Sequence, residues 1–475
     1  MKGGLVQRLT AMDAQFLYAE EEIPAAHSHT LKVSIYDPGP EPYSFETSKA
    51  TLRDRLDRLP PFRWRLVPVP LDLHHPVWIE DPDFDLDWHV RRMAAPAPGG
   101  PRELCELISE IASRQLERTR PLWELWLIEG LEGGQVAAVA KVHHALADGV
   151  SSAALLDLFH DTVPDAEAAP PEQPWRPEPV PSKSTLVLQA LRDVFRVLFT
   201  GLPQLLQAVR AAKQKKTIAG LAESEMPPKA FKAPTLAFNR IITPHRIFTI
   251  ASASLDDVKQ VRAAFDCTIN DVFLATVAGG MRRYLQGRNE LPDAPLVGSV
   301  PTSTRTEDEK YTWGNRLSKL YVHLRTDIDD PVERLMAQRG SAQAMKKEFE
   351  ITRGARLENW IDVMPVPMLR WTGRMFDRVK RLGGPSSENL IMSNVPGPRQ
   401  PLYAGGAKLG AFYSIGPIAV GVGLNITVWS YVNQLNYCLI ACREAMPDLW
   451  DLTDHIRDEL TVLMKAAANK QQAAS

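Results

Sequence analysis

The chain has 475 residues, of which 44% are hydrophobic and 24% are charged, and its formal net charge is −2. The length favours two or three domains, and the composition is typical of a soluble globular protein. The small net charge gives no electrostatic reason to expect a nucleic acid partner. The four cysteines are scattered without metal-ligand spacing, which predicts reduced thiols and neither a disulfide framework nor a zinc site. No signal-peptide core and no apolar run of about 18 residues are present, so we expect a cytoplasmic protein.

Residues 1–160 form a first predicted unit that mixes helices with strands. Hydrophobic periodicity predicts helices at residues 9–17, 47–59 and 102–116, the first of them capped near Thr10. Apolar and alternating runs predict strands at residues 30–36, 64–69, 77–79, 119–128 and 135–142. We expect the second and third of these strands to pair, and the last two to form a hairpin.

Residues 161–230 differ from their surroundings. The proline-rich part, residues 161–184, cannot build a packed core and predicts a semi-rigid linker. Residues 185–216 predict a basic amphipathic helix that Pro203 interrupts or kinks. Two interpretations of this helix stay open. It packs on its own protein, which is the default, or it lies on an anionic membrane surface.

Residues 231–475 form a second predicted unit. Its predicted strands are residues 246–253, 296–300, 317–324, 424–431 and 435–441, the last two as antiparallel neighbours. Its predicted helices are residues 255–265, 268–285 and 449–466. Because both units mix helices with strands of several lengths, we expect an α/β protein of the α+β type.

The stretch that carries chemistry is KVHHALADGV at residues 141–150. It would place two histidines on a turn between a buried strand and a helix N-terminus, where functional groups often lie. A metal site is one interpretation, although adjacent histidines on a turn generally point apart and the HExxH pattern is missing. A structural histidine pair is the second. A general base on a loop shaped by Asp148 and Gly149 is the third.

Residues 143–149 match the HHxxxDG motif of the superfamily of CoA-dependent acyltransferases, which includes chloramphenicol acetyltransferase and peptide-synthetase condensation domains. Further segments are RPLWE (120–124), NDVFLA (270–275), SVPTSTR (299–305), GN (314–315), SNVPGP (393–398) and GLNITVWSY (423–431). In this order, over nearly the whole chain, they resemble the bacterial wax ester synthase/acyl-CoA:diacylglycerol acyltransferase family. The chain departs from the family at Phe273, where a smaller aliphatic residue is more frequent. GAFYS at residues 410–414 replaces the DFGWG signature of the plant branch.

This resemblance implies two chloramphenicol-acetyltransferase-like lobes, residues 1–160 and 231–475, joined by residues 161–230. A tunnel between the lobes would admit acyl-CoA at one mouth and an alcohol at the other. The implied reaction moves a long-chain acyl group to diacylglycerol, and also to long-chain alcohols. Acyl-CoA is then a substrate, and we expect no metal or other cofactor. Contact with membranes or lipid inclusions is a further expectation, and the oligomeric state stays open.

Two alternatives belong to other classes of protein. One is a carrier-protein-dependent condensation domain, against which the lack of adenylation or carrier domains argues. The other is a non-catalytic lipid-binding protein of the same fold, which the intact histidine motif disfavours.

The resemblance also implies roles for individual residues. His144 would be the general base that takes the proton of the acceptor hydroxyl, with His143 in a supporting role. The position of Asp148 suggests the carboxylate of a triad, but the resemblance implies that this residue pairs with an arginine and holds the loop. We expect Arg305 to be that arginine, and Gly149 to give the loop its backbone freedom.

Asn270 has two interpretations. Either Thr268 or Asn270 caps the helix at residues 268–285, or Asn270 presents its amide to the tunnel and stabilises the oxyanion or positions the thioester. Asp271 would favour the helix N-terminus electrostatically. Residues 393–398 predict a turn. The candidates for lining the tunnel are Trp123, which core packing explains more readily, and Ser393, Asn425 and Thr427.

Overall fold

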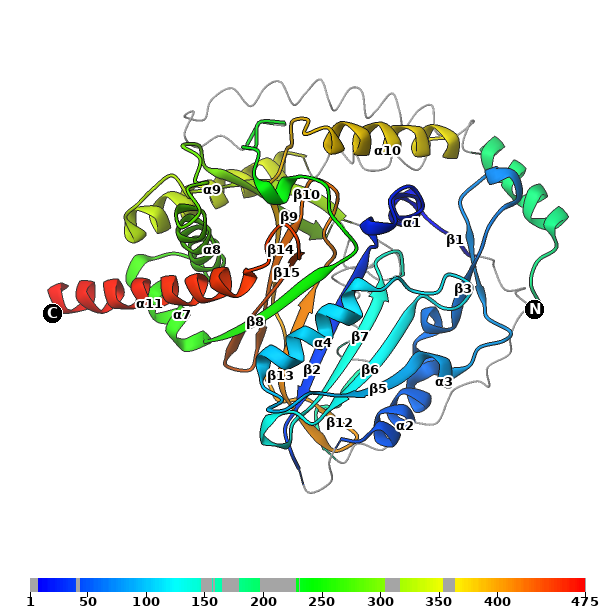
Figure 1. Cartoon of the computed structure of the whole chain (residues 1–475), viewed down its shortest axis with the longest axis horizontal. Helices are drawn as coiled ribbons and strands as arrows, with labels where there is room; N and C mark the ends of the chain where they lie inside the picture. The colour runs from blue at the N-terminus through cyan, green and yellow to red at the C-terminus, as the bar shows by residue number, and fades with distance from the viewer. Residues whose placement is uncertain are drawn as a thin grey trace.

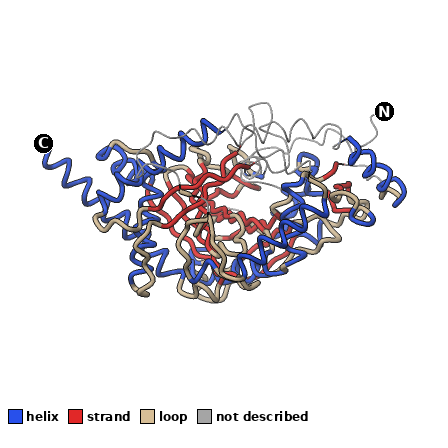
Figure 2. Tube along the Cα trace, turned by 90° about the horizontal axis from the view of Figure 1, so that it is seen from above, coloured by secondary structure: helices blue, strands red, loops and turns tan. Residues whose placement is uncertain are grey.

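Three β-sheets organise the chain, and helices cover their outer faces (Figure 1). The structure is a computed structural model that describes residues 7–39, 43–146, 156, 159–164, 179–196, 228–229, 231–303, 317–352 and 364–474. Seen from above, the strands gather in the interior and the helices lie mainly outside them (Figure 2). The α+β class expected from the sequence is confirmed, with two mixed lobes side by side.

The first six-stranded sheet has the order β12-β13-β2-β7-β6-β5. Its strands are β2 (His29–Tyr36), β5 (Val90–Ala94), β6 (Trp123–Glu129), β7 (Val136–His143), β12 (Tyr403–Ala404) and β13 (Ala407–Ile415). The predicted hairpin is confirmed, since β6 and β7 pair antiparallel. A small sheet of β1 (Gln7–Arg8), β4 (Val77–Glu80) and β3 (Trp64–Val67) contains the predicted pairing of β3 with β4.

The helices of the first half begin where side chains satisfy their first backbone N–H groups. These helices are α1 (Ala11–Glu22), α2 (Phe45–Arg55), α3 (Leu86–His89) and α4 (Pro101–Ser113). The predicted cap of α1 is confirmed, because the Thr10 hydroxyl accepts from the Asp13 N–H at 3.1 Å. At the start of α4, Pro101 occupies the first turn and the Glu103 carboxylate accepts from the Gly100 N–H at 2.8 Å.

The second six-stranded sheet has the order β10-β9-β11-β14-β15-β8. Its strands are β8 (Arg246–Ser254), β9 (Leu296–Ser303), β10 (Leu317–Leu324), β11 (Leu390–Val395), β14 (Leu424–Tyr431) and β15 (Gln434–Cys442). The helices of this half are α7 (Leu255–Phe265), α8 (Ile269–Gln286), α9 (Pro331–Thr352), α10 (Val366–Arg381) and α11 (Leu449–Ala474). The antiparallel pairing predicted for β14 and β15 is confirmed.

The sheets do not follow the predicted division of the chain at every strand. The boundary at residue 231 assigned everything after it to the second lobe, but β12 and β13 complete the first sheet. β13 pairs antiparallel with β2. It thereby hydrogen-bonds the backbone groups along the edge of β2 that does not face β7. An apolar cluster with members from both sheets and from α4 joins the two lobes, and it includes Leu31, Val33, Ile108, Phe248, Cys438 and Ile440.

Of the predicted helix at residues 185–216, the described part is helical from residue 183 to residue 196. Leu186 packs against Val77 and Ile79 of the small sheet. The Arg8 guanidinium donates to the Asp193 carboxylate at 2.9 Å. This part of the helix is therefore packed on its own protein, while Pro203 lies outside the described residues. Among those residues, no helix is long and apolar enough to cross a membrane.

Several histidines are buried in the first lobe as neutral side chains. Burial, with nearby cationic groups, lowers the pKa of His27 to about 4 and that of His75 to about 3. Burial also lowers the pKa of His160 to about 4 and that of His29 well below its ordinary value. In the unfolded chain each of these histidines titrates near 6.5, where histidine has its ordinary pKa.

These depressed pKa values predict acid sensitivity. Between about pH 6.5 and pH 4 the unfolded chain binds protons that the fold excludes, so each such histidine removes about 1.4 kcal/mol of stability per pH unit as the pH falls. We expect the melting temperature to fall continuously from pH 7 to pH 4.5. The variant His160→Gln should show a shallower fall. A melting temperature that stays constant over this interval would contradict the assignment.

Candidate active site

His144 lies at the turn that follows β7, as the sequence predicted. Its backbone N–H donates to the Ser28 carbonyl at 2.7 Å. Its imidazole stacks on the Phe16 ring of α1, with centroids 4.4 Å apart and planes inclined by 23°. The side chain is half-buried. The backbone of His144 is therefore fixed by Ser28, and one face of its ring is covered by Phe16.

His143 points the other way, as alternation along a strand requires. Its backbone N–H donates to the Leu122 carbonyl at 3.0 Å, and its side chain is buried. The Nδ1 atom accepts a hydrogen bond from the Ala145 N–H at 3.1 Å. Because an accepting Nδ1 carries no proton, the neutral ring holds its proton on Nε2.

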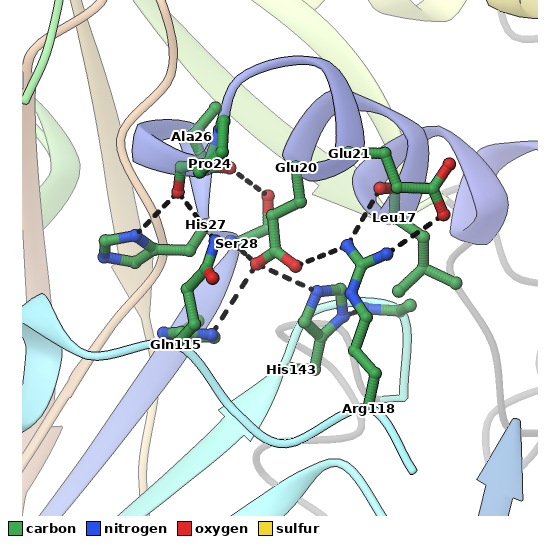
Figure 3. A network of polar contacts seen from close by, with 12 residues as sticks. Leu17, Glu20, Glu21, Pro24, Ala26, His27, Ser28, Gln115, Arg118 and His143 are labelled. Carbon is green, nitrogen blue, oxygen red and sulfur yellow. Dashed lines mark hydrogen bonds and ion pairs between the residues drawn. The ribbon is translucent and has the colours of Figure 1, made fainter. Parts of the chain in front are cut away.

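A buried carboxylate that the sequence analysis did not single out lies beside His143 (Figure 3). Glu20, in the last turn of α1, has its Oε1 atom 3.4 Å from the Nε2 atom of His143. The same oxygen accepts from the Ser28 N–H at 3.0 Å. The other oxygen accepts from the Arg118 guanidinium at 2.6 Å. Burial alone would raise the pKa of Glu20, but the contacts with His143 and Arg118 outweigh burial and lower that pKa to about 2.

Two further histidines border this carboxylate. The Nε2 atom of His29 lies 3.6 Å from the Oε1 atom of Glu20. The His27 ring stacks on the His29 ring at 4.8 Å, and its Nε2 atom lies 2.8 Å from the Ala112 carbonyl. Within the described ranges, no three His, Cys, Asp or Glu side chains are arranged to hold a metal ion. The partner in closest contact with Glu20 is the guanidinium of Arg118.

Three of the predicted site residues, Asp148, Gly149 and Arg305, lie outside the described residues. Their predicted support of the motif loop therefore stays a prediction. The same holds for the helix predicted after the motif, except at Leu156 and Phe159, which are helical.

The N-cap of α8 is Thr268, so the interpretation of Asn270 as that cap is wrong. The Thr268 hydroxyl accepts from the Asp271 N–H at 3.2 Å, and the Asp271 carboxylate accepts from the Thr268 N–H at 2.8 Å. This reciprocal pair leaves no capping role for Asn270, which lies inside the first turn. The Oδ1 atom of Asn270 instead accepts from the Asn394 side-chain amide at 3.3 Å.

Ser393, Asn425 and Thr427 lie on one face of the second sheet. Ser393 is in β11 and pairs in register with Thr427 of β14, so the turn predicted from residue 393 is wrong up to Val395, where the strand ends. The Thr427 hydroxyl donates to the Asn425 side chain at 3.1 Å. Alternate β14 residues pack with the helices of the second lobe, namely Leu424, Ile426 and Val428. The polar side chains therefore face away from those helices.

Trp123 is buried within the first lobe. Its indole N–H donates to the Phe62 carbonyl at 2.7 Å, and its ring stacks on His89 at 4.4 Å. These contacts are those of a core residue. The neighbouring Leu122 carbonyl accepts from the His143 N–H, so this segment supports the strand that carries the motif.

A cavity of about 730 Å³ lies between the lobes, at the end of β7 that is remote from the histidines. Its lining includes Gln135, Ile250 and Tyr413. The length of β7, at about 3.3 Å per residue, puts His143 roughly 23 Å from the start of that strand. This cavity therefore does not enclose His144, and the tunnel around the motif remains a prediction.

Comparison with known proteins agrees with this architecture. Residues 9–273 match the family model for the wax ester synthase/diacylglycerol acyltransferase catalytic domain, and residues 313–464 match that for the WS/DGAT C-terminal domain. A putative diacylglycerol O-acyltransferase from Mycobacterium tuberculosis (strain ATCC 25618 / H37Rv) is 38% identical over 480 residues, covering 99% of this chain and 100% of the relative. The O-acyltransferase WSD of Acinetobacter baylyi is 35% identical over 401 residues, covering 83% of this chain and 84% of the relative.

Solved structures show the same fold. A wax ester synthase/diacylglycerol acyltransferase from Marinobacter aquaeolei VT8 superposes with a TM-score of 0.70 at 27% identity, covering 97% of this chain and 100% of that one. The starter condensation domain of rhizomide synthetase, at 14% identity and a TM-score of 0.56, shares the fold alone, over 98% of this chain and 94% of that one. The chain therefore belongs to the wax ester synthase/diacylglycerol acyltransferase family.

Proposed function

We propose that this enzyme transfers a long-chain fatty acyl group from acyl-CoA to the hydroxyl of diacylglycerol, and also to long-chain alcohols. Membership of the family supports the acyl-CoA-dependent O-acyltransferase activity. The observation that carries the mechanism is the presentation of His144 on a turn, half-buried and held against Phe16. In this proposal acyl-CoA is a substrate, and the reaction uses no further cofactor.

A neutral alcohol is a poor nucleophile near pH 7, so the reaction requires a base. The His144 imidazole takes the proton of the acceptor hydroxyl while that oxygen attacks the thioester carbonyl. The tetrahedral oxyanion then collapses, the carbon–sulfur bond breaks, and CoA leaves as a thiolate that recovers the proton from the imidazolium. Direct transfer of this kind needs no acyl-enzyme, and the sequence has no serine in a GxSxG elbow that would form one.

Other residues would assist His144 in this scheme. Asn270 is proposed to position the thioester or to stabilise the oxyanion through its amide. The face of the second sheet that carries Ser393, Asn425 and Thr427 is proposed to line the tunnel. Asp148, Gly149 and Arg305 are proposed to hold the motif loop. Trp123 would act through packing of the first lobe, which its contacts with Phe62 and His89 support.

The variant His144→Ala tests the base. We expect turnover to fall roughly 100- to 10,000-fold, the usual contribution of a placed proton acceptor, with an unchanged melting temperature. The measurement is ester formation from radiolabelled palmitoyl-CoA with diolein or hexadecanol. His245→Ala, which removes an exposed histidine paired with Glu444, is the matched control and should keep full turnover. Near-normal turnover of His144→Ala would refute the base.

The same assay separates the alternatives. A condensation-type enzyme would use a carrier-linked acyl donor in place of palmitoyl-CoA. A non-catalytic lipid-binding protein would retain the lipid and form no ester. Failure of the purified protein to form any CoA-dependent ester would eliminate the proposed function.

We further propose that the enzyme works at a lipid surface and meets it through α10. α10 lies along α1 at the edge of the molecule (Figure 1). Val366 and Leu369 face the protein and are buried. Six large apolar side chains of this segment are nevertheless 43–80% exposed, and they are Met368, Trp371, Met375, Phe376, Val379 and Leu382.

All of these residues except Phe376 follow one another at intervals of three or four residues and give a continuous apolar stripe on the solvent side of the helix. Exposed Arg374, Arg378 and Arg381 lie along one edge of the stripe. Ion pairs of Arg370 with Glu21 and of Arg374 with Glu22 fix α10 to α1. An outward apolar stripe with a basic border suits a membrane interface that contains anionic lipids.

Serine substitution of Trp371, Met375 and Phe376 tests this surface. We expect roughly 10- to 100-fold weaker binding to vesicles of phosphatidylcholine and phosphatidylglycerol, because about 2–3 kcal/mol of apolar transfer is lost. Vesicle flotation measures the binding, and turnover with a water-soluble short-chain alcohol should stay unchanged. A parallel variant replaces the exposed Leu188, Leu191 and Phe195 by serine, and it should lose less binding than the α10 variant. Equal flotation of both triple variants and the wild type would overturn the proposal.

A further inference from the structure

Glu20 contacts both of the residues whose hydrogen bonds fix the backbone around His144, Ser28 through a hydrogen bond and His143 at 3.4 Å. The Oε1 atom of Glu20 accepts from the Ser28 N–H, and the Ser28 carbonyl accepts from the His144 N–H at 2.7 Å. The same oxygen lies 3.4 Å from the Nε2 atom of His143, whose Nδ1 atom accepts from the Ala145 N–H. One oxygen atom of Glu20 therefore contacts both Ser28 and His143 (Figure 3). Ser28 in turn bonds to the N–H of His144, and His143 bonds to the N–H of Ala145.

The same helix also holds the His144 ring. Phe16, which stacks on that ring, precedes Glu20 by four residues in α1, so the two side chains lie on one face of the helix. α1 therefore contacts His144 directly through an aromatic face and indirectly through a carboxylate.

We propose that Glu20 is a positioning residue for the reaction and sets the place of His144 through Ser28 and His143. The proposal rests on the proposed function of His144 as the base, and it gives His143 the role of a connector with its Nε2–H directed at the carboxylate. Glu20 itself does not touch the substrate in this scheme.

The second oxygen of Glu20 explains how the carboxylate stays in place. Arg118 donates to this oxygen at 2.6 Å and also donates to the Leu17 carbonyl at 2.9 Å, so the guanidinium is bound to α1 at two points. Arg118 is paired with Glu21 as well, at 3.0 Å. Arg118 therefore holds the carboxylate through its Oε2 atom. The Oε1 atom is free to contact Ser28 and the histidines.

A displacement of His144 matters because proton transfer depends steeply on geometry. A misplacement of about 1 Å lowers the rate of a positioned reaction by roughly 100-fold. Removal of the Glu20 side chain frees Ser28 and His143 together. We therefore expect the loss to fall on kcat, and the KM for acyl-CoA to change little.

Three substitutions distinguish the effect of the length of the Glu20 side chain from the effect of its charge. Glu20→Asp keeps the charge for Arg118 but withdraws the oxygens by one methylene from Ser28 and His143. Glu20→Gln loses the charge but keeps an accepting oxygen at the original reach. Glu21→Gln, which removes another partner of Arg118 next to Glu20 in the chain, is the matched control.

We expect kcat to fall roughly 10- to 100-fold in Glu20→Asp. Glu20→Gln should lose less than about 5-fold, because its oxygen still accepts from the Ser28 N–H. Glu21→Gln should keep wild-type kcat. Circular dichroism melting on each variant normalises turnover to folded protein. A Glu20→Asp variant with wild-type kcat would overturn the positioning role, and so would a larger loss in Glu20→Gln than in Glu20→Asp.

A double substitution distinguishes positioning from general destabilisation. If Glu20 acts only through His144, adding Glu20→Asp to His144→Ala should cost no further kcat, because residues that act as a unit are not additive. An equal loss in both backgrounds would refute the proposal. Normal turnover in His144→Ala would refute the base itself. Lost turnover in His144→Ala together with normal turnover in Glu20→Asp would refute the positioning role alone.

Discussion

The burial of the Glu20 carboxylate constrains the architecture around the motif. An ionised carboxylate loses several kcal/mol of hydration energy when it leaves water, unless charged or hydrogen-bonding partners replace the solvent. Its partners come from separate parts of the chain, since Arg118 precedes β6, Ser28 precedes β2 and His143 ends β7. α1 can dock only where all of these partners converge. The orientation of His144 thus depends on how the protein satisfies the charge of Glu20, which lies on the opposite side of the end of β7.

Much of the scaffold could be predicted because it depends on local patterns. The apolar run at residues 135–142 predicted β7, and Thr10 and Thr268 were recognisable as helix caps. Glu20 was not predicted, because in Tyr18-Ala-Glu-Glu-Glu22 it looks like one member of a solvated acidic run. Its burial depends on Arg118, 98 residues away, and no local pattern records that contact. The alternatives for Asn270 likewise needed the hydrogen bonds of Thr268 and Asp271 to be decided.

α10 illustrates a different limit of sequence reasoning. A 3.6-residue apolar period indicates that a helix has an apolar face, but it does not indicate what covers that face. In α10 most large apolar side chains are exposed, and the contact with α1 combines the buried Val366 and Leu369 with arginine–glutamate pairs, such as Arg370 with Glu21. The helix that the sequence suggested for a membrane, near residues 185–216, packs its described part on the small sheet. Both helices keep large apolar side chains exposed, such as Phe195 in the one and Trp371 in the other, so what the structure adds is which side of each helix is covered.

The pairing of β13 with β2 has a consequence for how the chain is made. Residues 407–415 are translated long after β2, β5, β6 and β7, so on the ribosome β2 has only β7 beside it until β13 has emerged. An open strand edge pairs readily with other chains. The sheet that carries the histidines is therefore one of the last parts to become complete, and a nascent chain cut short before residue 407 would expose that edge permanently. Completion of the first sheet thus requires that the chain has been made at least to residue 415.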